Sequence, residues 1–267
     1  MRPSLRVLTL NLWNRSEPFA ERMAAVRKGL TELQPDVVGL QEVILADDLD
    51  QATLVAEGLG YHKAFGAADR TLGNALLSRW PILHHETFAL PRGGTNEGRS
   101  LLYARVDSPH GKIPFFVTHL NWRLNEGHVR ELQVREVTDR IADLAPVHGF
   151  PPILMGDFNA EPESDEMRFL RGLTSLHGRS VYFADAFLNA GPAEHAGQTG
   201  QGRTFCRRNP FAAPLLEPDR RIDYVYVRGP DDRGRGEPLE AEVCFDLPYD
   251  GVFASDHFGV LATVSAG

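Results

Sequence analysis

The chain has few cysteines, few lysines and no long apolar run. Its two cysteines, Cys206 and Cys244, make neither a disulfide framework nor a thiolate metal motif, and we interpret both as ordinary buried thiols. No run approaches the ~18 apolar residues of a membrane span. The N-terminus enters a strand pattern at once, without a charged leader or a cleavage site. We therefore expect a cytoplasmic protein with no integral membrane association.

No segment rich in proline, serine or glycine divides the chain. With 267 residues, 42% of them hydrophobic, the chain can bury a substantial core. The candidate site residues described below run from Asn11 to His257, so that the site needs both halves of the chain. We expect a single domain over residues 1–267, and a monomer.

The net charge of −8 repels polyanions at long range, which disfavours a protein that coats DNA without regard to sequence. Twenty-five of the 28 basic residues are arginine, and five of these precede a predicted strand at 222–227: Arg203, Arg207, Arg208, Arg220 and Arg221. The guanidinium group suits phosphate. A phosphate-binding surface and a solvated loop are both consistent with this cluster.

The hydrophobic pattern alternates between strand-like and helix-like periods. Helices are predicted at 18–33, 49–59 and 128–144, the last of them a long surface helix. Strands are predicted at 6–12, 36–43, 61–65, 74–78, 83–90, 100–107, 112–119, 153–156, 203–206, 222–227, 239–245 and 257–264. Several strands are consecutive, which predicts hairpins.

Polar residues lie at the ends of these strands. Asn11, Glu42, His119 and Asp157 follow or finish theirs, whereas Asp223 and His257 begin theirs. One rim can collect both sets only if the last strands run opposite to the first. We therefore expect an α/β protein with mixed, mostly antiparallel sheets packed face to face and helices outside, rather than a wholly parallel sheet.

These side chains are oxygen donors and histidines, with no thiolate among them. Glu42 offers an anionic oxygen and Asn11 a neutral one at neighbouring strand ends. Such a set suits Mg²⁺ or Mn²⁺ and phosphate chemistry. We expect Asp223 to contact one nitrogen of His257. A carboxylate there makes the other nitrogen a better proton acceptor, or a better hydrogen-bond donor to a phosphate.

Taken together, the motifs resemble the endonuclease/exonuclease/phosphatase superfamily of metal-dependent phosphoesterases, with its DNase-I-like and sphingomyelinase-like branches. Seven segments match in the family's order: 9–13 (TLNLW), 40–43 (LQEV), 76–82 (LLSRWPI), 117–120 (VTHL), 156–159 (GDFN), 221–225 (RIDYV) and 255–257 (SDH). They cover nearly the whole chain. The resemblance implies a four-layer α/β sandwich with the site at one end.

The resemblance also implies roles for individual residues. The implied metal ligands are Asn11, Glu42, Asp256 and Asp157, and the implied catalytic residues are His119, Asp157, Asn159, Asp223 and His257. Asp157 aligns or activates the attacking water, or binds a second metal. His257, oriented by Asp223, is a general base or a phosphate contact, and Asn159 holds a phosphate oxygen. His119 stabilises charge on the phosphoryl oxygens or protonates the leaving group. Arg99 and Asn121 are candidates for binding substrate phosphate.

The chain differs at two positions from one branch of the superfamily. Abasic-site endonucleases of this superfamily carry an aspartate where this chain has Trp13, and a tyrosine where it has His119. Both differences argue against abasic-site repair. In addition, no carboxylate partner for His119 is evident from the sequence.

Three functions are carried forward. The first is a Mg²⁺- or Mn²⁺-dependent hydrolase of a small-molecule phosphoester or a lipid headgroup, by in-line attack of water. The second is an endonuclease or exonuclease with the same chemistry, which keeps nucleic acid open as a partner and requires the arginines from Arg203 to Arg221 to line the cleft. The third is a binding module that has kept the fold and lost catalysis.

Overall fold

The structure is a computed structural model that describes residues 2–145, 147–191 and 202–267. Its helices are α1 (Phe19–Leu33), α2 (Gln51–Ala56), α3 (Gly127–Leu144), α4 (Asp165–Leu170), α5 (Ala186–Ala190) and the short 3-10 helix Ala213–Leu215. Its strands are β1 (Ser4–Asn11), β2 (Val37–Ala46), β3 (Leu49–Asp50), β4 (His62–Asp69), β5 (Leu72–Ser78), β6 (Ile82–Ala89), β7 (Ser100–Ser108), β8 (Gly111–His119), β9 (Ile153–Asp157), β10 (Ala184–Asp185), β11 (Asp223–Val227), β12 (Pro238–Cys244) and β13 (Gly259–Ser265).

The strands form two mixed sheets. One has the order β12-β13-β1-β2-β5-β4, with β3 paired to β2, and the other has the order β10-β11-β9-β8-β7-β6. Only β1 with β2 and β8 with β9 pair in parallel among the described strands, and the remaining pairs are antiparallel. As expected, β13 runs opposite to β1 and β11 runs opposite to β9, which brings the early and late site residues to one rim.

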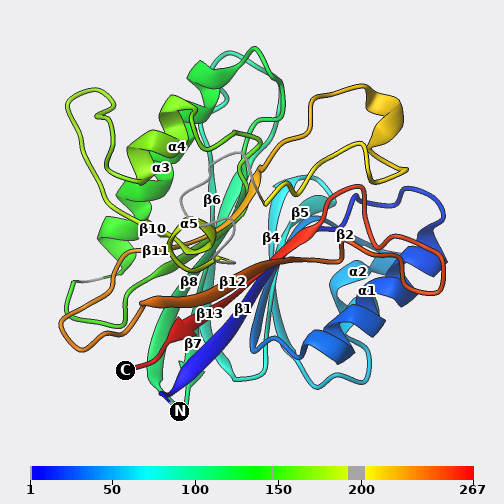
Figure 1. The fold of residues 1–267 in the computed structure, drawn as a ribbon, viewed down its shortest axis with the longest axis horizontal. Helices are drawn as coiled ribbons and strands as arrows, with labels where there is room; N and C mark the ends of the chain where they lie inside the picture. Colours follow the sequence, from blue (N-terminus) through cyan, green and yellow to red (C-terminus); the bar gives the residue numbers. More distant parts are fainter. Residues whose placement is uncertain (1, 146, 192–201) are drawn as a thin grey trace.

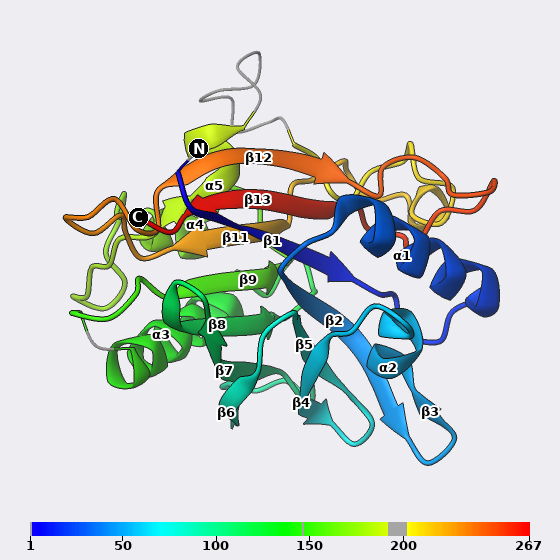
Figure 2. The same ribbon diagram turned by 90° about the horizontal axis from the view of Figure 1, so that it is seen from below.

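Strand β1 shows how the sequence builds the layers. Leu5 and Val7 join the core between the two sheets, whereas Leu8 and Leu10 join a second core under α1. Successive side chains of a strand point to opposite faces, so that β1 needs apolar residues on both. A third core lies between the second sheet and helices α3 and α4. Figures 1 and 2 show the resulting order of helices, sheet, sheet and helices. The expected four-layer sandwich is confirmed.

Helix α3 follows the predicted pattern closely. Val129, Val134, Val137 and Ile141 are fully buried, whereas the charged residues between them are partly exposed, except for Arg130, which is buried. Helix α2 is shorter than the predicted 49–59. Its first two predicted residues pair with β2 as strand β3, and the Asp50 side chain then caps the helix by accepting from the Thr53 amide at 3.0 Å.

The predicted strand at 203–206 is wrong. Phe205 and Arg220 form only an isolated antiparallel bridge, in which each amide donates to the other's carbonyl, and the chain then enters a loop. Short elements such as α4, β10 and α5 were not predicted, because two to six residues do not establish a period. Among the described residues, no helix is long and apolar enough to span a bilayer.

Candidate active site

Three predicted site residues lie side by side on adjacent strands of the second sheet. In the parallel pairing of β8 with β9, His119 is opposite Asp157, and in the antiparallel pairing of β9 with β11, Asp157 is opposite Asp223. The row therefore reads His119, Asp157, Asp223 across three neighbouring strand ends. Backbone hydrogen bonding alone sets these residues at strand spacing.

Gly156 makes the close pairing of these strands achievable. Its φ is +153°, and a Cβ atom there would lie 2.0 Å from the Thr118 carbonyl oxygen of β8. Any other residue would push β9 away from β8 just before Asp157. The glycine of the Gly-Asp-Phe-Asn motif therefore has a structural cause.

The first sheet supplies the opposite side of the site. Asn11 ends β1, and Glu42 lies in β2 where the pairing with β5 skips between Leu40 and Val43. Glu42 has a φ of +53°, which a non-glycine residue adopts only at a cost of order 1–3 kcal/mol. Asn14 at +41° and Asn159 at +52° share this strain. At these positions the irregular backbone aims side chains that a regular strand would aim elsewhere.

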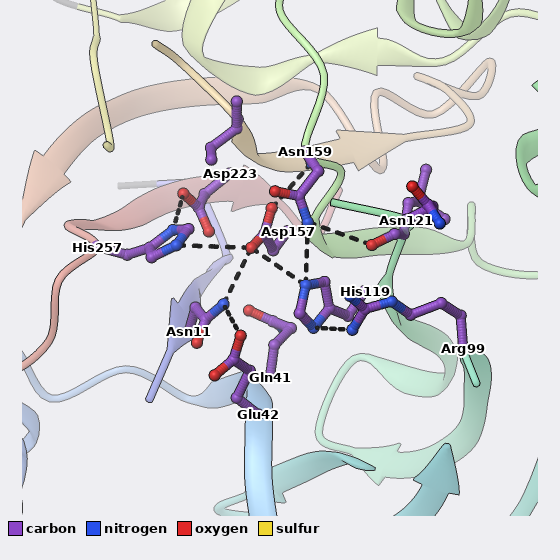
Figure 3. A network of polar contacts seen from close by, with 12 residues as sticks. Asn11, Gln41, Glu42, Arg99, His119, Asn121, Asp157, Asn159, Asp223 and His257 are labelled. Carbon is purple, nitrogen blue, oxygen red and sulfur yellow. Dashed lines mark hydrogen bonds and ion pairs between the residues drawn. The ribbon is translucent and has the colours of Figure 1, made fainter. Parts of the chain in front are cut away.

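His257 is paired with a carboxylate, as expected. Its Nδ1 lies 3.0 Å from Asp223 Oδ2, and its Nε2 lies 3.7 Å from Asp157 Oδ2 (Figure 3). One atom from each of the three residues lies within 4.8 Å of the others. Although burial lowers the pKa of His257, the surrounding carboxylates, led by Asp223 and Asp157, raise it well above its ordinary value overall. The imidazolium form of His257 is therefore favoured in the protein without a bound ligand.

The partner of His119 is a cation, whereas the partner of His257 is a carboxylate. Its Nδ1 lies 3.1 Å from Arg99 Nη1, and Arg99 is 8% exposed. A guanidinium has only donors, so Nδ1 accepts and Nε2 carries the proton of a neutral ring. Asn159 Nδ2 lies 3.0 Å from this Nε2 and donates to the Leu120 carbonyl at 3.2 Å, while Asp157 Oδ2 lies 3.5 Å from the same ring nitrogen as an acceptor. Burial, and then the nearby Arg99 charge, lower the pKa of His119 well below its ordinary value.

Asp157 lies at the centre of this network. Its Oδ2 is 3.5 Å from His119 Nε2 and accepts from Asn11 Nδ2 at 3.0 Å. Its Oδ1 accepts from the backbone N–H of Asn159 at 2.9 Å. Burial, followed by the charge of Asp223, raises the pKa of Asp157 to about 7. Asp157 therefore exchanges its proton near neutral pH.

Asp256 and Glu42 complete the acidic side. Burial, and then the charge of Glu42, raise the pKa of Asp256 to about 6. Glu42 Oε2 accepts from Asn14 Nδ2 at 2.9 Å, and Glu42 Oε1 is 3.4 Å from Asn11 Nδ2. The Asn11 amide thus lies between the carboxylates of Glu42 and Asp157, where it offsets part of their charge. Asp223 Oδ1 is buried without a hydrogen-bond partner.

Seven of the ten predicted residues line one cavity of about 350 Å³, whereas Asn11 and Asp223 lie behind it and bond Asp157 and His257. Among its lining residues are Glu42, Arg99, His119, Asp157, Asp256 and His257. Asn121 does not line it. This residue is fully buried, and its Oδ1 accepts from the Arg123 amide, so that its side chain shapes the loop after β8. Asn121 is therefore poorly placed to touch a phosphate.

Arg22 was not predicted, although it supports the site. It is fully buried, and its guanidinium donates to five backbone carbonyls: those of Leu12, Trp13, Asn14, Ser16 and Ala254. It thereby joins the loop after Asn11 to the loop that carries Asp256. Burial lowers its pKa to about 10. A signal existed in the sequence, because Arg22 precedes Val26 by four residues on the apolar stripe of α1.

Phe205 and Arg220 were also missed as wall residues of the cavity. The Phe205 ring packs on the His257 ring with centroids 5.0 Å apart. The Arg220 guanidinium lies over the same Phe205 ring, 5.4 Å from its centroid. Phe205 comes from the segment where a strand was wrongly predicted, and Arg220 is its partner in the isolated bridge. A loop with long-range aromatic contacts leaves no periodic signal in a sequence.

Comparisons with known proteins identify the family of the chain. The model of the "Endonuclease/Exonuclease/phosphatase family" matches residues 8–257. YbhP of Escherichia coli K12 is 28% identical over 248 residues, which cover 84% of this chain and 85% of YbhP. The fold is similar to the human Nocturnin catalytic domain with bound sulfate (TM-score 0.76, 19% identity, 99% of this chain and 95% of that one).

Danio rerio TDP2 complexed with a single-strand DNA product is also similar, with a TM-score of 0.75 and 23% identity over 98% of this chain and 99% of the other. These two solved structures share the fold with this protein. The family match spans every motif from the β1 strand to His257. The chain therefore belongs to the endonuclease/exonuclease/phosphatase family, whose members are typically hydrolases acting on phosphoesters.

Proposed function

We propose that the protein is a metal-dependent hydrolase of phosphoester bonds that acts on a small-molecule or lipid phosphoester. The observation that carries this proposal is the arrangement of His119, Asp157 and His257 around one cavity, with Asp223 behind His257. Such a set can bind a phosphoryl group on two sides and hold a water between them.

The donor set fits a hard divalent cation. Asp157 and Asp256 have raised pKa values of about 7 and about 6, because burial and neighbouring carboxylates disfavour their charge. A cation relieves that repulsion. Asn11, Glu42 and Asp256 would hold Mg²⁺ or Mn²⁺, which prefers oxygen ligands, and Asp157 is left for the attacking water. When bound, the ion supplies positive charge that stabilises the phosphoryl and leaving oxygens.

The protein's own groups divide the remaining work. Asp157, with a pKa of about 7, accepts the proton of the attacking water, because a base is most effective when its pKa lies near the working pH. His257, held by Asp223, points its Nε2–H at a phosphoryl oxygen. Attack is in line with the leaving oxygen, and no covalent enzyme intermediate is needed.

His119 donates from the other side of the phosphoryl group. Because Arg99 occupies its Nδ1, the neutral ring presents Nε2–H to the cavity. A neutral imidazole with a lowered pKa is a hydrogen-bond donor rather than a proton source. His119 therefore stabilises charge on the phosphoryl oxygens and does not protonate the leaving group.

The loop arginines favour a small substrate. Arg221 is buried against Asp185 at 2.8 Å, Arg208 pairs with Asp246 at 3.0 Å, and Arg207 bonds carbonyls of its own loop. Of the five clustered arginines, Arg220 alone lines the cavity. The cluster therefore folds the loop instead of tracking a nucleic-acid backbone.

A nuclease of the same chemistry is the second candidate, favoured by the similarity to a TDP2 bound to a DNA product. A non-catalytic binding module is the third. The two catalytic candidates predict turnover that the third does not. Under the third, Glu42→Ala and His257→Ala leave function intact.

The test is hydrolysis of bis-p-nitrophenyl phosphate, p-nitrophenyl phosphate, sphingomyelin and plasmid DNA with Mg²⁺, Mn²⁺ or EDTA. We expect metal-dependent turnover of a small or lipid phosphoester that His257→Ala abolishes. Preference for the plasmid would select the nuclease. Absence of turnover with every substrate and metal would contradict the catalytic assignment, and metal titration of Glu42→Ala would then test the ligand set directly.

A further inference from the structure

Trp122 lies at the mouth of the catalytic cavity. It follows His119 by three residues on the loop that leaves β8, and it lines the same cavity as His119 and Asp157. The residue is 43% exposed. A single exposed tryptophan is ordinary, so that its meaning depends on whether the ring is held in place.

Two side chains hold the Trp122 ring. Its Nε1–H donates to Glu97 Oε1 at 3.1 Å, which fixes the edge of the indole. The Arg123 guanidinium lies 4.6 Å from the ring centroid and stacks on one face. The ring therefore has a fixed plane, although much of its surface is open to solvent.

The backbone of this loop is held as well. Arg130 of α3 donates to the carbonyl of Arg123 at 2.7 Å, and Gln133 of α3 accepts from the amide of Asn121 at 2.9 Å. Arg130 is itself fixed by Glu166 at 2.6 Å. The ring is thus held rigid without being buried, so that its surface is available to a ligand at no further ordering cost.

We propose, on the basis of the hydrolase function above, that Trp122 is the stacking platform for a planar aromatic group of the substrate, a nucleobase-type ring joined to the scissile phosphate. Base and aromatic rings stack on such a flat face. Glu97 lines the same cavity at the edge of the indole. A carboxylate there disfavours an alkyl chain, which would desolvate it, and suits a ring with polar edges.

The test measures binding rather than turnover. Adenosine 5′-monophosphate and ribose 5-phosphate share a phosphate and a sugar and differ by the base. Their dissociation constants are measured by calorimetry in Ca²⁺ for wild type, Trp122→Ala, Trp122→Phe and Tyr182→Ala. Tyr182 is an exposed aromatic residue, 56% accessible, that does not line the cavity.

We expect wild type to bind the nucleotide at least about fivefold more tightly than the sugar phosphate, the ratio that a single stacked base supports. Trp122→Ala brings the ratio close to one, Trp122→Phe keeps part of it, and Tyr182→Ala keeps all of it. A merely structural Trp122 would weaken both ligands together and leave the ratio unchanged.

An unchanged ratio in Trp122→Ala overturns the proposal. The proposal is also overturned if hexyl phosphate binds wild type as tightly as the nucleotide and Trp122→Ala weakens the binding of both ligands equally. That result would assign the surface to alkyl chains. Failure of the nucleotide to bind wild type also overturns it. The hydrolysis panel with His257→Ala reports on the proposed function separately, so that the two failures are distinguishable.

Discussion

The two histidines of the site lie at similar distances from the same oxygen of Asp157, 3.5 Å for His119 and 3.7 Å for His257, yet their partners have opposite charge. Asp223 holds His257, and Arg99 holds His119. One ring is driven towards the imidazolium, the other towards the neutral form. The role of a histidine is therefore set by what its second nitrogen contacts, which a motif does not reveal.

Replacing the carboxylate behind His257 should have the largest effect. In Asp223→Asn, an amide can donate to Nδ1 and so reverse the tautomer of the ring. We expect kcat to fall by roughly 10³-fold with little change in fold, as for other oriented histidines. Steady-state kinetics with the best substrate of the panel measures this. Asp107→Asn, the same change at an exposed carboxylate of β7, is the control. Undiminished kcat in Asp223→Asn would remove His257 from the mechanism.

Asp157 is the carboxylate that the two histidines share, and its raised pKa predicts a pH dependence of stability. The folded protein holds this proton up to about pH 7, whereas an unfolded aspartate releases it near 3.8. The native state binds more protons over that window, so that stability contributed by the protonated form is lost as the pH rises from about 4 to 7.

Asp157→Asn removes this dependence. Compared with wild type in EDTA, the variant should gain about 4 kcal/mol of relative stability between pH 4 and pH 8. Denaturant unfolding at each pH measures the difference, and taking the difference cancels the titration of the other groups. Adding Mg²⁺ should stabilise wild type more at pH 8 than at pH 5. A difference that stays flat with pH would show that Asp157 is ionised throughout.

Changing the partner of His119 should have a smaller effect. Arg99→Gln removes the cation at Nδ1, and we expect kcat/KM to fall by about 10- to 100-fold. Without that charge the pKa of His119 moves back towards its ordinary value, so that an acidic limb appears in the pH profile of kcat/KM. Arg99→Lys keeps a donor and a charge, and should recover part of the loss. Equal losses in both variants with an unaltered pH profile would mean that Arg99 acts only on the fold.

The smallest effect is expected away from both histidines. Arg208 pairs with Asp246 at the surface, with its side chain 58% exposed. Arg208→Ala should change kcat/KM less than twofold and stability by less than about 1 kcal/mol. A clear loss of plasmid cleavage together with a shallower salt dependence would instead show that the loop arginines contact a polyanion, which would favour the nuclease.

The sequence predicted the parts of this molecule that carry a period or a motif. The strands of both sheets and helices α1 and α3 follow apolar patterns, and the antiparallel direction of β11 and β13 followed from the order of polar residues at strand ends. Asp223 was identified as the partner of His257 on the same grounds. These features depend on local apolar periods or on the order of the strands, and both can be inferred from the amino-acid sequence.

What the sequence did not reveal depends on contacts between distant segments. Arg99 was a candidate for binding substrate phosphate, and its contact with His119, which exists only once β7 and β8 pair, was not predicted. Arg22 was not identified, because its carbonyl partners belong to two loops that meet α1 only in the fold. The strand predicted at 203–206 had the right residue types, but Phe205 uses its ring to cover His257. Tertiary contacts overrode local preference at each of these positions.

The in-register row of His119, Asp157 and Asp223 has a consequence for how such a protein can change. The spacing of these groups belongs to the sheet, so that the reactive centre cannot open or drift unless strand pairing is broken. The loops at its mouth, including the one that carries Trp122, are free of that constraint. Substitutions there can retarget the protein to a new ligand while the reactive centre stays where it is, which makes the loops the natural place to engineer it.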